Sequence, residues 1–352
     1  MKCNPTLSLL RALSVSAFVL ASFQVAHAAP VSATPVVDND WRTSIVEEND
    51  SLYFNSDKHY TQGLRFSFLS PSLGDSWTNW FYDVAGNIPT VFGPTGTRRV
   101  AILGGQSIFT PKDIQAKPSD PRDRPYAGWL YGGLSFLQET NGTALENLEI
   151  DLGVVGPGAL GRQVQNDFHQ FINVKQAQGW GNQIQHEVGG VLTYERAWHV
   201  ALLGDTLNGG FGLDAVPSIG ATVGNVFDYG AVGGMIRLGK HLEADYGPIR
   251  IRPALSGSDY FNPSKLDHEW GYYIFAGTQG RVVGRNIFLD GNSFRHSPSV
   301  QSQPLVADFQ AGVSAFDGAG LRVDFSAVRR TREFVGQQHP DVIGTAAIAF
   351  SW

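Results

Sequence analysis

The chain has 352 residues, a formal net charge of −6 and one cysteine, Cys3, close to its N-terminus. The acidic balance argues against nucleic acid as a partner. With no cysteine after position 3, neither disulfides nor thiol chemistry can serve the rest of the chain.

The N-terminal residues 1–28 are predicted to be a secretory signal peptide. Lys2 and Arg11 give a positive start, residues 12–21 form a short apolar core, and Ala26-His27-Ala28 is a small-residue cleavage box. The apolar core is too short to span a bilayer. Removal of residues 1–28 takes away two positive charges and no negative ones, so the formal charge changes from −6 to −8.

After the leader the chain has no long apolar run, and its dominant pattern is alternation with period two. Residues 148–154, 305–315 and 321–326 place apolar side chains on one face and polar or small ones on the other. We therefore predict an all-β fold with about twelve strands. The expected strand centres are Ser44, Phe66, Ile102, Leu130, Ile150, Val191, Ala215, Val232, Ile274, Val313, Phe325 and Ile348.

Three architectures explain such alternation: a soluble sandwich, a soluble barrel and a transmembrane antiparallel β-barrel. A sandwich packs its apolar face on a second sheet, whereas a transmembrane barrel turns that face to lipid and its polar face to the lumen. The chain closes on Phe350-Ser351-Trp352, which resembles the C-terminal aromatic signal read by the barrel-assembly machinery of bacterial outer membranes. We therefore favour one outer-membrane β-barrel domain over residues 29–352, with a secreted sandwich as the alternative.

Four connections between the expected strands are long: residues 71–98, 107–124, 156–181 and 257–269. Barrels of this class keep short turns at the periplasmic end and long loops at the outer end. If the first strand runs outward, the third of these connections is extracellular.

A helix is predicted over residues 160–173, inside that third connection. Val164, Phe168, Phe171 and Ile172 recur there at helical spacing, a pattern found nowhere else after the leader. His169 and Gln165 are four residues apart, so they project from one helical face. A histidine held on a short helix over a sheet is a candidate general base; the alternative is a polar residue on the solvated side of a loop helix.

Common hydrolase motifs are missing from the sequence. It contains no HExxH motif and no paired Cys/His set, so a zinc hydrolase lacks support. It also contains no GxSxG motif, and no serine can be paired with His169. A water nucleophile with a metal-stabilised oxyanion therefore fits better than an acyl-enzyme.

The end of the first expected strand carries candidate metal ligands. Asn49 and Asp50 offer hard oxygen donors of the kind that Ca²⁺ prefers, and Glu47 and Glu48 add negative charge. If the first two strands form a hairpin, Thr61 lies across from this pair and brings a hydroxyl and a carbonyl. The alternatives are ordinary turn chemistry for the first pair and an ordinary strand-start threonine.

A dense motif precedes the fourth expected strand. It consists of Thr110-Pro111-Lys112 and of the run Asp-Arg-Pro-Tyr-Ala-Gly-Trp over residues 123–129. Its basic residues, Lys112 and Arg124 among them, could bind phosphate groups. The alternative is a structured loop with solvated charges.

These motifs together resemble the outer-membrane lipid A 3-O-deacylase family of Gram-negative bacteria. The resemblance covers essentially the whole chain after the leader. Its most specific part is the strand exit at residues 151–157, followed at fixed spacing by Gln163-Val-Gln165-Asn166-x-x-His169. The pieces around Asn49-Asp50, residues 60–63 and residues 124–128 support it jointly.

The resemblance implies a twelve-stranded barrel with a calcium-dependent hydrolytic site between the barrel wall and a short extracellular helix. It implies that the substrate is lipid A of lipopolysaccharide among outer-membrane lipids, cleaved at its ester-linked 3′-acyloxyacyl chain. His169 would be the general base, and Asn49, Asp50 and Thr61 would be the metal-side and catalytic polar residues. Gln165 would be a supporting neighbour in substrate binding, with Lys112 and Arg124 as further candidate substrate contacts. The basic loop departs from the family pattern in length and spacing, so no single lysine is assigned to a phosphate.

Two other functions remain open from the sequence. One is an outer-membrane channel; a barrel of about twelve strands is narrow, and polar side chains such as Arg322, Asp324 and Gln310 are expected to fill its lumen. The other is an interaction barrel without catalytic activity.

Overall fold

The computed structural model describes residues 38–54, 58–73, 79–87, 91–93, 95–251, 253 and 259–352. The predicted leader, residues 1–28, lies outside this part of the chain.

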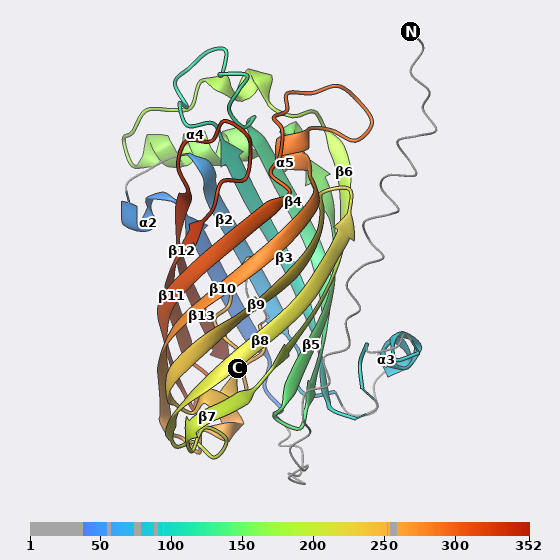
Figure 1. Ribbon diagram of the computed structural model, residues 1–352, viewed down its shortest axis with the longest axis vertical. Helices are drawn as coiled ribbons and strands as arrows, with labels where there is room; N and C mark the ends of the chain where they lie inside the picture. The colour runs from blue at the N-terminus through green and yellow to red at the C-terminus, as the bar shows by residue number, and fades with distance from the viewer. Residues whose placement is uncertain are drawn as a thin grey trace. The chain divides into compact units, whose positions relative to one another are not determined.

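The strands form one antiparallel sheet that closes on itself into a barrel (Figure 1). Neighbouring strands follow the chain order, β13 pairs with β1, and β6 pairs with β8 to close the ring. The short β7 continues β6 along β8, so the thirteen strand segments make a barrel of twelve strands. The predicted barrel is confirmed, and each expected strand centre lies in a different barrel strand. The strands are β1 (Arg42–Asn49), β2 (His59–Leu69), β3 (Thr97–Thr110), β4 (Ala127–Thr140), β5 (Ala144–Val155), β6 (Glu187–Trp198), β7 (Val200–Gly204), β8 (Phe211–Gly224), β9 (Phe227–Lys240), β10 (Trp270–Asn286), β11 (Leu305–Asp317), β12 (Arg322–Arg330) and β13 (Asp341–Ser351).

Short helices decorate both ends of the barrel. None of those in the described ranges is long and apolar enough to cross a bilayer. They are α2 (Ser51–Phe54), α3 (Asn79–Ala85), α4 (Gly161–Phe171) and α5 (Ile287–Asp290), with single 3-10 turns η1 (Pro157–Ala159), η2 (Gly179–Asn182), η3 (Leu242–Ala244) and η4 (Pro263–Lys265).

The barrel carries its apolar side chains outside and its charged side chains inside. Outward positions such as Ile102, Leu152 and Ile274 are exposed along the wall. Inward arginines are fully buried and paired; Arg65, for example, donates to Asp259 at 2.6 Å. This distribution is that of a transmembrane barrel, because a soluble sandwich or barrel would bury its apolar face instead.

The connection between β9 and β10 folds back into the lumen over residues 241–251. Near one end of the barrel, Asp245 pairs with Arg237 of β9 and with Arg322 of β12. Farther along the segment, Arg250 pairs with Glu48 of β1, near the opposite end of the barrel. The segment therefore follows the barrel axis and fills the interior, together with the polar wall side chains that were expected there.

The long connections lie at both ends of the barrel. Residues 111–126 and 156–186 lie at the end that carries α4, whereas residues 70–96 and 241–269 join strands at the opposite end (Figure 1). The two at the far end have structural roles: residues 241–251 occupy the lumen, and α3 packs on the outer wall, with Phe81 stacked on Phe136 at 3.7 Å between ring centroids. The rule of short turns at one end thus does not hold here.

Candidate functional site

The helix α4 lies on the outer face of the barrel wall, where it packs against β3 and β4. Its buried face consists of Gly161, Gln165 and His169, spaced four residues apart. Gly161 lies against Gly128 of β4: a Cβ on Gly161 would come within 3.5 Å of the Gly128 Cα and 2.7 Å of the Trp180 ring. Two glycines therefore allow the helix backbone to approach the wall.

His169 is held by a backbone carbonyl of its own loop. Its Nδ1 lies 2.8 Å from the carbonyl oxygen of Lys175, and only 7% of the residue is exposed. A carbonyl can only accept a hydrogen bond, so a neutral His169 carries its proton on Nδ1 and its lone pair on Nε2. This tautomer is the one that a general base acting through Nε2 needs.

Gln165 joins the helix to the returning chain. The Trp180 indole N–H donates to its Oε1 at 2.8 Å. Trp180 packs with Ile108 of β3 and with Tyr126, so this bond ties α4 to a small apolar cluster on the outer wall. Gln165 and His169 thus share one face, as predicted, and the role of Gln165 in the structure is to position α4.

Asn49 and Asp50 lie where β1 ends. The Asn49 side-chain oxygen accepts from the backbone N–H of Ser51 at 2.7 Å and from its hydroxyl at 2.6 Å. Asp50 is buried, and its Oδ2 accepts from the Lys58 N–H at 2.5 Å. Both residues therefore shape the β1–β2 connection, as the turn alternative requires, while they present oxygen atoms at one strand end.

Thr61 faces the same outer surface as Asn49. In the predicted hairpin, Asn49 lies opposite Gln62, next to Thr61. A bulge between Tyr60 and Gln62 interrupts the pairing of β2 with β3. The Thr61 hydroxyl lies 2.7 Å from that of Thr110, and both residues are buried.

Thr110 joins the candidate site although the sequence does not predict a role for it. In the sequence it is part of the motif before Lys112, and in the structure it ends β3 on the outward face, in phase with Ile108 under α4. The pairing of β2 with β3 is what reveals it, because His59 and Thr110 are partners in that register.

The two glutamates before Asn49 serve different faces of the wall. Glu47 shares the outward face with Asn49 and hydrogen-bonds with Asn49 and Gln62. Glu48 points into the lumen, where it binds Arg250 and accepts from the Ile251 N–H at 3.2 Å. Only Glu47 therefore adds charge to the candidate site.

The two predicted basic substrate contacts have different surroundings. Lys112 is exposed, and its Nζ donates to Gln338 at 3.2 Å. Arg124 is fully buried, lies over the Phe109 ring at 4.7 Å and pairs with Glu333 at 3.3 Å. The expectation that Arg124 meets a substrate phosphate is therefore not supported, because its guanidinium is inside the barrel end.

Asp123 fixes the loop that carries both basic residues. Its carboxylate accepts from the backbone N–H groups of Lys112 at 2.7 Å and Arg124 at 2.8 Å, and it lies 3.4 Å from His59 Nε2. Burial opposes its ionisation, but the hydrogen bonds from His59 and from the backbone hold the pKa of Asp123 below the ordinary value. The carboxylate thus stays charged and the loop stays ordered near neutral pH.

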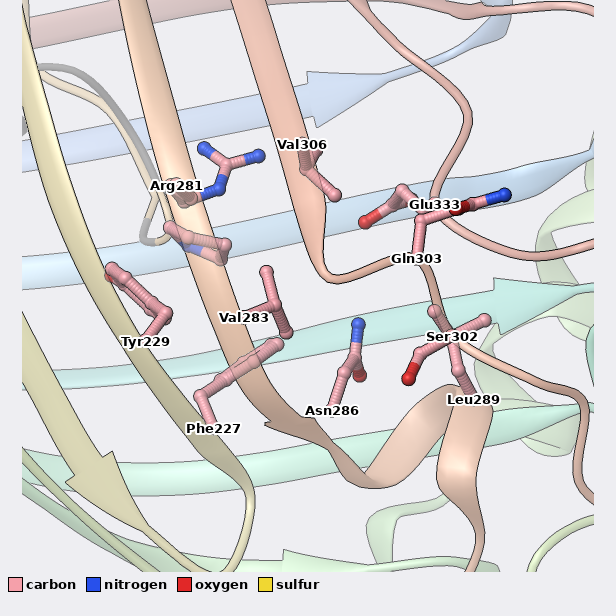
Figure 2. A pocket seen from close by; sticks show the side chains of 11 residues that line it. Phe227, Tyr229, Arg281, Val283, Asn286, Leu289, Ser302, Gln303, Val306 and Glu333 are labelled. Carbon is pink, nitrogen blue, oxygen red and sulfur yellow. The ribbon is translucent and has the colours of Figure 1, made fainter. Parts of the chain in front are cut away.

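The small pocket shown in Figure 2 lies on the lumen side of the wall, near the end that carries α4. Its lining includes Arg281, Asn286 and Glu333, and it contains none of the predicted site residues. The candidate chemistry is instead on the outer face of the wall.

The outer strand ends supply oxygen donors suited to a hard cation. Glu47 and Asp50 bring carboxylates, Asn49 an amide oxygen and Thr61 a hydroxyl. Within the described ranges no group of three or more His, Cys, Asp and Glu side chains is arranged to hold a metal, so a site here depends on the amide and the hydroxyl as well. This donor chemistry fits Ca²⁺ and does not fit zinc.

The strand β3 connects the two halves of the candidate site. On one side α4 packs against β3 and brings in His169 and Gln165. On the other side Thr110 at the end of β3 bonds Thr61, and β2 in turn pairs with β1 next to Asn49. The chain of contacts through β3 therefore links His169 and Gln165 to Thr61 and Asn49 at one barrel end.

Comparison with known proteins agrees with this architecture. LpxR from Salmonella typhimurium superposes with a TM-score of 0.68 at 20% identity, covering 88% of this chain and 99% of that chain. Two more distant structures are also similar. The β domain of the Bordetella autotransporter Brka has a TM-score of 0.38 at 12% identity, covering 89% of this chain and 99% of that chain. A bacterial polysaccharide outer membrane secretin has a TM-score of 0.34 at 9% identity, covering 90% of this chain and 99% of that chain. No curated protein matches the sequence.

A family model described as "Outer membrane protein LpxR" matches residues 13–352. The match covers nearly the whole chain, including every strand of the barrel. The protein is thus an outer-membrane protein whose strands cross the membrane, and the chain belongs to the outer membrane protein LpxR family.

Proposed function

We propose that this barrel is a calcium-dependent lipid A deacylase that hydrolyses the ester-linked 3′-acyloxyacyl chain of lipid A. The observation that carries the proposal is the placement of His169 on the buried face of a helix packed on the outer wall against β3 and β4, where Thr110 at the end of β3 bonds Thr61 of β2. A lipid substrate reaches an outer-wall site from the membrane, whereas a soluble substrate would more naturally use the lumen. The helix-bearing end then faces the outside.

His169 is the general base in this mechanism. With Nδ1–H donated to the Lys175 carbonyl, Nε2 takes a proton from water as the water oxygen attacks the ester carbonyl. When the tetrahedral intermediate collapses, the bond between the carbonyl carbon and the sugar oxygen breaks, and Nε2 returns the proton to that oxygen. The products are a free fatty acid and a sugar hydroxyl.

The strand ends position the reacting ester. Glu47, Asn49, Asp50 and Thr61 are the residues that would hold Ca²⁺, which when bound polarises an ester carbonyl and stabilises the oxyanion. The Thr61–Thr110 pair fixes the side chain of Thr61. Lys112, exposed on the neighbouring loop, is the basic residue available to a lipid A phosphate.

The channel alternative is disfavoured by the filled lumen. Residues 241–251 run inside the barrel and are buried along their length, and Asp245 is paired with arginines from two strands. An open pore would require this segment to leave.

Mass spectrometry of lipid A from cells that express the chain tests the proposal. Wild-type protein is expected to yield lipid A that lacks the 3′-acyloxyacyl mass, and a calcium chelator added to isolated outer membranes is expected to stop the conversion. His169→Ala should reduce the rate by about 10²–10⁴-fold, the usual contribution of a general base.

The control is Gln163→Ala, an exposed change on the same helix. Heat-modifiable migration in gels establishes that each variant has a folded barrel. If lipid A stays unmodified although the wild-type protein is folded and calcium is present, the proposal is wrong and the protein is an interaction barrel without catalytic activity. Full activity of His169→Ala would remove the histidine from the mechanism.

A further inference from the structure

The helix α4 leaves its two phenylalanines exposed, while the residues on its buried face are polar or small. Phe171 is 85% exposed and Phe168 48%, and Ile172 directly after the helix is also exposed. The buried face is formed by Gly161, Gln165 and His169. An amphipathic helix on a water-soluble surface has the opposite arrangement.

The exposed apolar residues form one flank of the helix beside the buried face. At 100° per residue, Phe168 and Phe171 fall to one side of Gln165 and His169, and Asn166 falls to the other side. The Asn166 side is covered: its Oδ1 accepts from the Ala177 N–H at 2.9 Å, and the next turn of chain bonds to the β3–β4 connection through Gln178 N–H and the Ile114 carbonyl at 2.8 Å. The long connections thus cover the Asn166 flank, whereas Phe168 and Phe171 on the opposite flank stay exposed.

The wall on that side continues the apolar surface. Leu130 of β4, Leu152 of β5 and Val188 of β6 are exposed on neighbouring outer positions. Leu160, which lies in the chain between β5 and α4, is exposed as well. In an outer-membrane barrel this part of the wall contacts acyl chains.

We propose that α4 is a membrane-interface helix whose apolar flank, Phe168, Phe171 and Ile172, lies among the acyl chains of the leaflet at its end of the barrel. Continuity with the lipid-facing wall identifies the occupant as membrane lipid. The polar residues Gln163 and Gln170 on the far side of the helix then face headgroups and water. This placement is independent of the proposed hydrolysis, although it would put the His169 face of the helix beside the leaflet.

Site-specific fluorescence quenching tests the placement. A Cys3→Ser background leaves the chain without thiols, so Phe171→Cys, Phe168→Cys and Gln163→Cys each provide a single site for a bimane label. The labelled barrels are placed in phosphatidylcholine vesicles with or without lipids brominated on their acyl chains. Quenching by brominated lipid is expected at positions 168 and 171, at least twofold stronger than at position 163.

Leu152→Cys on the lipid-facing wall of β5 is the positive control, and it establishes that the barrel has inserted. Strong quenching at position 152 with none at positions 168 and 171 would overturn the proposal. Equal quenching at positions 163 and 171 would do so too, because the helix would then not lie on its side in the interface.

Discussion

At the scale of single residues, the candidate site depends on hydroxyl and carboxyl groups at the ends of three strands. Thr61 and Thr110 come from different strands and share one buried hydrogen bond of 2.7 Å. A pair of this kind fixes both rotamers, so each hydroxyl depends on the other for its direction.

Thr110→Val should therefore lower the deacylation rate about five- to tenfold, which corresponds to the loss of one ordinary hydrogen bond of roughly 1–1.5 kcal/mol. Valine keeps the shape of threonine and removes only the hydroxyl. Thr110→Ser, which keeps the hydroxyl, should retain most of the activity. The measurement is the initial rate on lipid A in mixed micelles, and equal rates for the valine and serine variants would contradict the role of the hydroxyl.

Glu47 and Glu48 offer a matched comparison of the two faces of β1. Glu47 hydrogen-bonds with Asn49 on the outer face, so Glu47→Gln should raise the calcium concentration for half-maximal activity about 10–100-fold, as for residues that orient metal ligands. Glu48 binds Arg250 in the lumen, so Glu48→Gln should weaken the barrel without changing the calcium requirement. Calcium titrations of activity distinguish the two variants. Identical shifts in the calcium requirement would show that the total charge of β1 matters and not the face on which the glutamate lies.

At the scale of elements, the sequence predicts α4 but not how it packs. The spacing of Val164, Phe168 and Phe171 indicates a helix, and Gly161–Phe171 is indeed helical. Periodicity identifies an apolar flank but does not say whether protein or lipid covers it. The packing depends on Gly128 and Gly161. Because glycine has no side chain, neither residue contributes to the apolar pattern of the sequence.

For the strands too, the sequence predicts the elements but not everything that packs against them. Alternation locates all twelve barrel strands, because one face meets lipid and the other a polar lumen. It does not show that residues 241–251 enter the lumen, since their partners, such as Glu48 and Arg322, are distant in sequence. The burial of Arg124 could not be predicted for the same reason, because its partner Glu333 is far along the chain.

The close approach of α4 to β4 gives a prediction for Gly161→Ala. Alanine favours helix by up to about 1 kcal/mol, but its Cβ would lie 2.7 Å from the Trp180 ring. Trp180 is packed against Tyr126, so the helix must move away from the wall. A displacement near 1 Å of the helix that carries His169 should reduce activity about 10²-fold.

The barrel of Gly161→Ala should still fold, because its strands are unaffected. Gln163→Ala serves as the control for a helix-favouring change on an exposed position of α4. Activity assays beside heat-modifiable migration distinguish the effects. Normal activity in Gly161→Ala would mean that the contact with the wall is not what places His169.

At the scale of the whole molecule, the barrel is a closed wall around a polar core that includes part of its own chain. Planar-bilayer recordings of the wild-type protein are therefore expected to show no large steady openings, because residues 241–251 occupy the lumen. A porin of known conductance in the same bilayers verifies that openings are detectable. Steady openings from the wild-type protein would show that the segment leaves the lumen in a membrane.

Asp245 connects the inner segment to two strands of the wall. Its two carboxylate oxygens bind Arg237 and Arg322, and its Oδ2 also accepts from the Tyr273 hydroxyl at 2.8 Å. Asp245→Ala removes the carboxylate that two fully buried guanidinium groups share, while Asp214 still pairs with Arg237 and Asp324 with Arg322; the cost should therefore lie below the ~3–5 kcal/mol of a buried charge left with no partner. The variant should lose its folded gel mobility at a markedly lower temperature and should also show intermittent conductance as the segment loosens.

Asp120→Ala breaks an exposed pair with Arg122 at 2.9 Å and should leave both readouts unchanged. Equal behaviour of the two variants would mean that the barrel is stable without its inner segment, so its strands alone would determine the fold.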